Sequence, residues 1–101
     1  MENINRLNQS ELERLALLSE ELGETQQAIG KILRHGYQSY NPYSAVRTTN
    51  RTDLEKELGD VLFAVDLMVG NKDIAEQNII IAKNQKAKKV FQFLHYQKPI
   101  G

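Results

Sequence analysis

The chain of 101 residues contains no cysteine, no tryptophan and only three phenylalanines. The absence of cysteine excludes disulfide bonds and thiolate chemistry, and it leaves the redox compartment unmarked. Because large aromatic side chains are so few, a core has to be built from Leu, Ile, Val and Ala, which suits helices packed on helices. The sequence therefore favours an all-α protein, and its length favours a single domain over residues 1–101.

The sequence also lacks a strong net charge and a long apolar run. Acidic and basic residues balance at 13 each, which argues against a basic binder of a nucleic acid polymer. Neither an apolar signal region nor a run of membrane-spanning length is present, so we expect a cytoplasmic protein without a membrane partner. A local absence stands out, because no acidic residue follows Glu76, whereas five lysines do: Lys83, Lys86, Lys88, Lys89 and Lys98.

The first helical segment is predicted from Ser10 to Arg34. Ser10 and Glu13 have the capping-box spacing, and Gly36 is a suitable stop. A helical projection gives the segment two apolar faces. One, taken as the core stripe, contains Leu15, Leu22 and Leu33, and the second contains Leu17, Ala28 and Ile32. A helix that is apolar on two sides leaves surface for a partner to cover.

Two further helices are predicted downstream. Thr52 and Glu55 repeat the capping-box spacing and open a helix over about 53–69. The same spacing at Asp73 opens a third helix, whose first half is apolar and whose second half carries the lysines, and which ends near residue 95.

The segment 37–50 between the first two helices shows no sustained period and is rich in Tyr, Asn, Ser and Thr, which is typical of an ordered loop. Loops of this length in compact domains are often functional. Tyr37 and its neighbouring tyrosines would stack on a nucleobase, or alternatively pin the loop to the body. Arg47 and Arg51 are candidates for contacts to phosphates.

Two acidic pairs carry the chemistry. Glu21 and Glu24 form one E-x-x-E pair, and Glu57 and Asp60 form an E-x-x-D pair. Residues three apart share a helix face, so four carboxylates converge if the two helices face each other. Such a cluster must stay hydrated or hold cations, and Asp60 favours the second option because it interrupts an otherwise apolar run. The oxygen-only donor set suits Mg²⁺ together with substrate phosphates.

The two acidic motifs, read with their neighbouring residues, resemble those of a known family. EELGE followed by ELGDVLFAV resembles the MazG-like all-α nucleoside triphosphate pyrophosphohydrolases, which are related to phosphoribosyl-ATP pyrophosphohydrolase and the dimeric dUTPases. The family pattern is E-E-x-x-E, a spacer and then E-x-x-D. The matching residues are Glu20, Glu21, Glu24, Glu57 and Asp60.

The resemblance implies Mg²⁺, with Mn²⁺ as a substitute, held by Glu21, Glu24, Glu57 and Asp60. It implies water attack that leaves a nucleoside monophosphate and pyrophosphate, with Glu20 or Glu21 orienting the water. It also implies a homodimer or homotetramer that completes a four-helix-bundle-like core. Lys83 and Lys86 are our candidates for phosphate contacts, because they follow the apolar half of the third helix.

The leading hypothesis is therefore a magnesium-dependent hydrolase of a (deoxy)nucleoside triphosphate that controls or cleans the nucleotide pool. Two alternatives stay open: a phosphoribosyl-ATP pyrophosphohydrolase, and a non-catalytic helical dimerisation or regulatory module on the same scaffold. The sequence leaves the base, the sugar and the number of metal ions undetermined.

Overall fold

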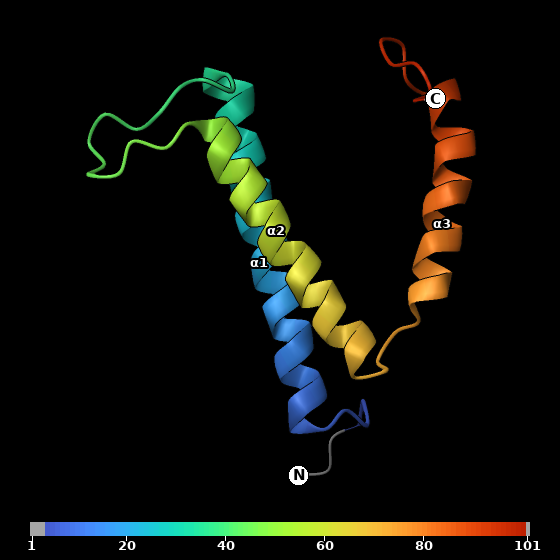
Figure 1. Cartoon of the computed structure of the whole chain (residues 1–101). Helices are drawn as coiled ribbons and strands as arrows, with labels where there is room; N and C mark the ends of the chain where they lie inside the picture. The colour runs from blue at the N-terminus through green and yellow to red at the C-terminus, as the bar shows by residue number, and fades with distance from the viewer. Residues whose placement is uncertain (1–3, 101) are drawn as a thin grey trace.

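A computed structural model describes residues 4–100. Its elements are α1 (Gln9–His35), α2 (Asn50–Gly70), α3 (Glu76–Lys89) and a short 3₁₀ helix, η1 (Val90–Gln92). The described residues contain no β-strand, which confirms the predicted all-α class with a helical hairpin and a third helix (Figure 1). Among these helices, none has the length and apolar character needed to span a bilayer.

The helices α1 and α2 form an antiparallel hairpin, in which they lie side by side along most of their length (Figure 1). Ala28 of α1 and Ala64 of α2 are buried in it, as is Met68. Each alanine follows the second residue of the acidic pair on its helix, Glu24 or Asp60, by four positions and so continues the acidic face. Their small side chains allow the backbones to run close together on both sides of the carboxylates.

In contrast, α3 lies apart from the hairpin (Figure 1), and none of its residues is buried. The radius of gyration of 17.4 Å reflects this separation, since a compact chain of about 100 residues would have a radius near 13 Å. Ile79, Ile80 and Ile81 of α3 are consequently exposed.

The predicted core stripe of α1 is wrong for the single chain. Leu15, Leu22 and Leu33 are 41, 51 and 82 % exposed, whereas Ala28 on the second face is 7 % exposed. The hairpin partner can cover only one of the two apolar faces, and α2 packs on the face that contains Ala28. Within α2, Leu58 is likewise 45 % exposed.

The predicted start of α1 is also corrected. Asn8, rather than Ser10, is the N-cap: its Oδ1 accepts the Glu11 N–H at 2.8 Å, and Glu11 Oε1 accepts the Asn8 N–H at 3.0 Å. This pair closes a capping box one residue before the helix. Ser10 instead accepts a hydrogen bond from Arg14. The predicted stop is confirmed, since Gly36 has φ 87° and its N–H donates to the Ile32 carbonyl at 2.7 Å.

The starts of the other two helices differ from prediction as well. The N-cap of α2 is Thr49 rather than Thr52, and its Oγ1 accepts the Thr52 N–H at 3.2 Å. α3 begins at Glu76 rather than at Asp73 and ends at Lys89, where η1 takes over. Asp73 is drawn away from a capping role because both of its carboxylate oxygens bind the Arg14 guanidinium of α1, at 2.5 and 2.9 Å.

Candidate metal centre and nucleotide site

The four carboxylates predicted to converge do lie together in the hairpin. Glu21 and Glu24 come from α1, and Glu57 and Asp60 come from the facing turns of α2. One oxygen from each of the four lies within 4.8 Å of the others. The spacing of three within each pair turns both side chains inward, and the antiparallel pairing sets the two pairs opposite each other.

The cluster is half-buried and electrostatically strained. Burial raises the pKa of Glu21 above its ordinary value, and the charges of Glu24, Asp60 and Glu57 raise it further. Among the described residues, Glu21 Oε2 and Glu57 Oε2 are buried without any hydrogen-bond partner. Buried acceptors without donors are costly, so their presence indicates a place for a cation. Four carboxylates without His or Cys are a donor set for a hard divalent ion.

One cation of the chain already contacts this cluster. The Lys56 ammonium lies 2.8 Å from Asp60 Oδ2 and 3.4 Å from Glu57 Oε1. Its hydrogen bond to Asp60 and the neighbouring negative charges raise the pKa of Lys56. The sequence reasoning missed Lys56, although its spacing of four from Asp60 is the spacing of a helical ion pair.

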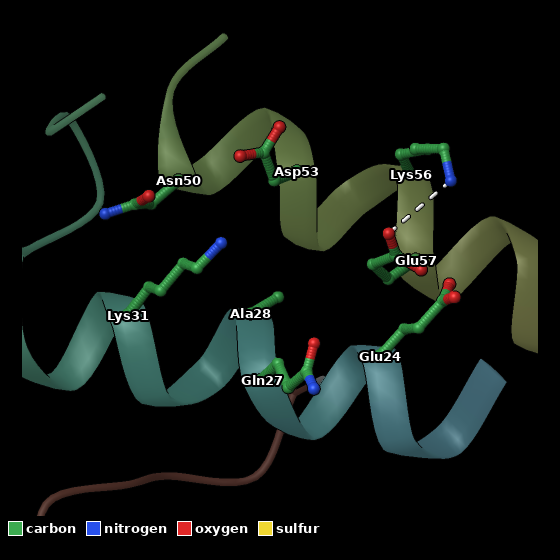
Figure 2. Close-up of a pocket in the computed structure, with 8 residues that line it drawn as sticks. All are labelled: Glu24, Gln27, Ala28, Lys31, Asn50, Asp53, Lys56 and Glu57. Atoms are coloured by element: carbon green, nitrogen blue, oxygen red, sulfur yellow. Dashed lines mark hydrogen bonds and ion pairs between the residues drawn. The ribbon is translucent and has the colours of Figure 1, made fainter. Parts of the chain in front are cut away.

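A hollow of about 370 Å³ opens beside the cluster, between α1 and α2 (Figure 2). Figure 2 shows Lys31 extending from α1 toward α2, and Lys56 in contact with Glu57 at the other end. Neither lysine was singled out from the sequence. The lining residues are Glu24, Gln27, Ala28, Lys31, Asn50, Asp53, Lys56 and Glu57. The hollow thus combines acidic groups at the cluster with two cations, Lys56 at the cluster and Lys31 toward the other end.

A second hollow of about 480 Å³ lies under the loop at the end of the hairpin. It shares Lys31, Asn50 and Asp53 with the first hollow, so the two adjoin. Tyr40, His35, Pro42 and Val46 give it apolar and aromatic surface that the first hollow lacks. Its lining also includes Arg34, Ser39, Asn41, Ser44 and Thr48.

The loop is tied down at both ends. The Asn50 N–H donates to the Ser39 carbonyl at 2.8 Å, and the Arg51 N–H donates to the Tyr37 carbonyl at 2.9 Å. The buried Asn50 amide also donates to the Gly36 carbonyl at 3.1 Å. These bonds confirm that the segment is an ordered loop, and they fix the wall of the second hollow.

A comparison with models of protein families matches residues 9–91 to the MazG nucleotide pyrophosphohydrolase domain. The chain belongs to the MazG family. A search of curated proteins and a search of solved structures each returned no match. Membership makes the protein a hydrolase of the nucleotide pyrophosphohydrolase type, and members of this family are generally dependent on a divalent metal. The acidic cluster is where such an ion fits in this MazG domain.

Three of the predicted site residues lie away from the cluster in the MazG chain. Glu20 is exposed and does not contribute to the group of converging oxygens. Lys83 and Lys86 are exposed on α3, which lies apart from the hairpin. Within one chain, therefore, the structure does not bring these lysines to the carboxylates.

The predicted nucleotide contacts of the loop pair with one another. The Arg51 guanidinium lies 5.0 Å from the centre of the Tyr37 ring, and Arg47 lies 5.5 Å from that of Tyr40. Such cation–π contacts help to hold the loop of the MazG domain. Tyr37, Arg47 and Arg51 do not line either hollow, whereas Tyr40 lines the second.

Proposed function

We propose that this MazG domain is a magnesium-dependent pyrophosphohydrolase of a (deoxy)nucleoside triphosphate, with Mn²⁺ as a substitute ion. The observation that carries the proposal is the convergence of four carboxylate oxygens within 4.8 Å, two of the four residues having a buried oxygen without a partner. Glu21, Glu24, Glu57 and Asp60 would hold the ion. When bound, the ion supplies charge neutralisation on phosphate oxygens and activation of water.

In the proposed reaction, water attacks the α-phosphorus while the bond from this phosphorus to the bridging oxygen breaks. The nucleoside monophosphate remains, and pyrophosphate leaves. Glu21 or its exposed neighbour Glu20 would orient the water and accept its proton. Lys31 and Lys56 would contact the phosphate chain in the first hollow, because both line it, Lys56 at the carboxylates and Lys31 toward the other end (Figure 2).

The adjoining second hollow would receive the nucleoside. Its aromatic and apolar surface suits a base and its polar side chains suit a sugar, and Lys31 lies on the border that the two hollows share. Tyr37, Arg47 and Arg51 would contribute by closing the loop over the substrate. The biological role would be nucleotide pool control or house-cleaning in the cytoplasm.

Self-association is part of the proposal. The exposed apolar residues of α1 and α2, with the three isoleucines of α3, are surface that a partner would cover. A homodimer or homotetramer would cover it and build a four-helix-bundle-like core. In such an assembly, α3 of a second copy would bring Lys83 and Lys86 to the phosphates.

The test is to incubate purified protein with Mg²⁺ and a panel of nucleoside triphosphates and phosphoribosyl-ATP, and to separate the products. We expect nucleoside monophosphate and pyrophosphate in equal amounts. Glu57→Gln should lower kcat by at least about 100-fold, because it removes a ligand of the ion. Glu55→Gln, an exposed change on the same helix, should leave the rate unchanged. Equal rates for the two variants would refute the proposed site.

The same panel separates the alternatives. Turnover of phosphoribosyl-ATP alone would identify a phosphoribosyl-ATP pyrophosphohydrolase. A regulatory module without catalysis would turn over none of the substrates, and Mg²⁺ would not raise its melting temperature. In the enzyme, Mg²⁺ binds the native state and must raise the melting temperature.

A further inference from the structure

Lys56 is a solvent-exposed side chain that contacts the carboxylate cluster. Its ammonium binds Asp60 Oδ2 and Glu57 Oε1, whereas the other oxygen of Glu57, Oε2, is buried and has no partner. Lys56 therefore neutralises part of the cluster but leaves this buried oxygen of Glu57 without a partner. Its side chain is 65 % exposed, so it is free to change rotamer without disturbing the packing of the hairpin.

We propose that Lys56 is a mobile counter-ion of the metal centre. In the metal-free protein it holds Asp60, and it gives up this bond when a divalent cation binds, so that its ammonium then binds the phosphate chain of the nucleotide. The inference rests on the proposed function, because it assigns Lys56 two successive partners in the same site.

The exchange follows from charge. A divalent ion on Asp60 and an ammonium on the same carboxylate repel each other at short distance, and the ammonium is the partner that the solvent-exposed side chain allows to move. Lys56 also lines the first hollow, opposite Lys31 (Figure 2). An ammonium released from Asp60 thus stays within the space proposed for the phosphates, where a lysine acts as a point charge.

Lys31 provides a matched comparison. It lines the same hollow and carries the same charge, but among the described residues it forms no ion pair with the cluster. A general effect of positive charge near the metal would appear in both lysines. Competition for Asp60 would appear in Lys56 alone.

The experiment titrates Mn²⁺ into the nucleotide-free, full-length protein by calorimetry, for the wild type, Lys56→Met, Lys56→Arg and Lys31→Met. We expect Lys56→Met to bind Mn²⁺ about tenfold more tightly than wild type, and the other two variants to stay within about threefold of it. An unchanged affinity of Lys56→Met, or an equal gain in Lys31→Met, would overturn the proposal.

The second step is measured by titrating inorganic triphosphate into the Mn²⁺-saturated proteins. Lys56→Met should bind it about tenfold more weakly than wild type, and Lys56→Arg should restore most of the affinity. Unchanged triphosphate binding would reduce Lys56 to a static counter-ion and overturn the mobile role. The two proposals fail differently: a wild type that does not bind Mn²⁺ refutes the metal centre itself, whereas tight wild-type binding with no effect of Lys56→Met refutes only the exchange.

Discussion

The hairpin and α3 differ in whether their side chains and helix ends find partners within the described chain. The hairpin has a capping box at its start, a glycine stop, and alanines that bring its two helices together. By contrast, α3 has no side-chain N-cap, no buried residue and five lysines in or after it. In the hairpin, α1 and α2 pack on each other. In contrast, α3 carries apolar and cationic side chains that nothing else in the described chain covers.

The two regions therefore differ in how much of the candidate site a single chain can assemble. Within the hairpin, a single chain is enough to assemble the four carboxylates, because both acidic pairs point into the same interface. The part of the site that would depend on α3 needs either a movement of this helix or a second copy of the chain. Substitutions in one region, matched by control substitutions elsewhere in the chain, therefore test this difference.

The largest effect is expected from placing a charge in the hairpin interface. Ala64 is 1 % exposed, so Ala64→Asp buries an unpaired carboxylate and should lower the free energy of unfolding by about 3 to 5 kcal/mol. Ala82→Asp on α3 is the matched control, and its loss of helix propensity should cost about 0.7 kcal/mol. Urea denaturation measures both. Equal losses would show that α3 is covered in solution as fully as the hairpin.

The next effect concerns the link between the two regions. Arg14 of α1 binds Asp73, just before α3, and this partly buried pair lowers the pKa of the Asp73 carboxyl. Arg14→Met should reduce the melting temperature by roughly five degrees and speed proteolysis within 71–75. Lys83→Met, on the exposed side of α3, should do neither. Because the Asp73 pKa is depressed, the contribution of the pair is present above the unfolded pKa and is lost as pH falls below it.

A smaller gain is expected at Gly23, which lies within the first acidic motif. Beyond its two chain neighbours and the backbone of its own helix, no heavy atom lies within 4 Å of where its Cβ would stand, so Gly23→Ala should stabilise α1 by about 0.5 to 1 kcal/mol. Gly36→Ala should destabilise instead, because φ there is 87°. Chemical denaturation at several protein concentrations is the measurement. A loss for Gly23→Ala that grows with concentration would place a second copy against this face.

The smallest effect is a pH dependence of the metal-free protein. The pKa of Glu21 is raised in the folded state, so its stabilising contribution is complete below the ordinary value of 4.5 and is lost as pH rises through the folded pKa. In EDTA at pH 7, Glu21→Gln should therefore melt higher than wild type, by roughly one to three degrees because solvent screens the cluster. Adding Mg²⁺ should reverse the order. The same ranking with and without Mg²⁺ would contradict the assignment of Glu21 as a ligand.

The fold class and the converging carboxylates were predictable because both depend on the helical repeat of the sequence. Spacings of three and four fixed the helices, and the same spacings placed Glu21 with Glu24 and Glu57 with Asp60 on inward faces. The exact caps were not predictable in the same way. Several residues near each helix start are able to cap it, and Asn8 and Thr49 prevailed through bonds that the alternatives do not make.

Other features depend on how the helices pack on each other, which the spacing of apolar residues in the sequence does not specify. Two apolar faces on α1 were recognised, but the sequence does not say which one α2 covers, and Leu22 proved exposed. Lys31 was missed because lysines on helices are ordinarily solvated, and only the packing of α1 against α2 makes it line the first hollow. Lys56 was missed although its spacing of four from Asp60 on the same helix is that of a helical ion pair. The roles of Lys83, Lys86, Tyr37, Arg47 and Arg51 stay predictions.

The paired bonds that close the loop, from Asn50 to Ser39 and from Arg51 to Tyr37, have a consequence for how this protein can change. They clamp the chain where it leaves α1 and enters α2, and the Thr48 hydroxyl, which donates to Asp53 Oδ1 of α2 at 2.6 Å, holds the last part of the loop. Doubling the length of such a closed segment costs only about 0.6 kcal/mol of closure entropy. Residues 40–47 thus form an exchangeable cassette, where insertions, deletions or a grafted sequence would alter the lining of the second hollow while the four converging carboxylates keep their register.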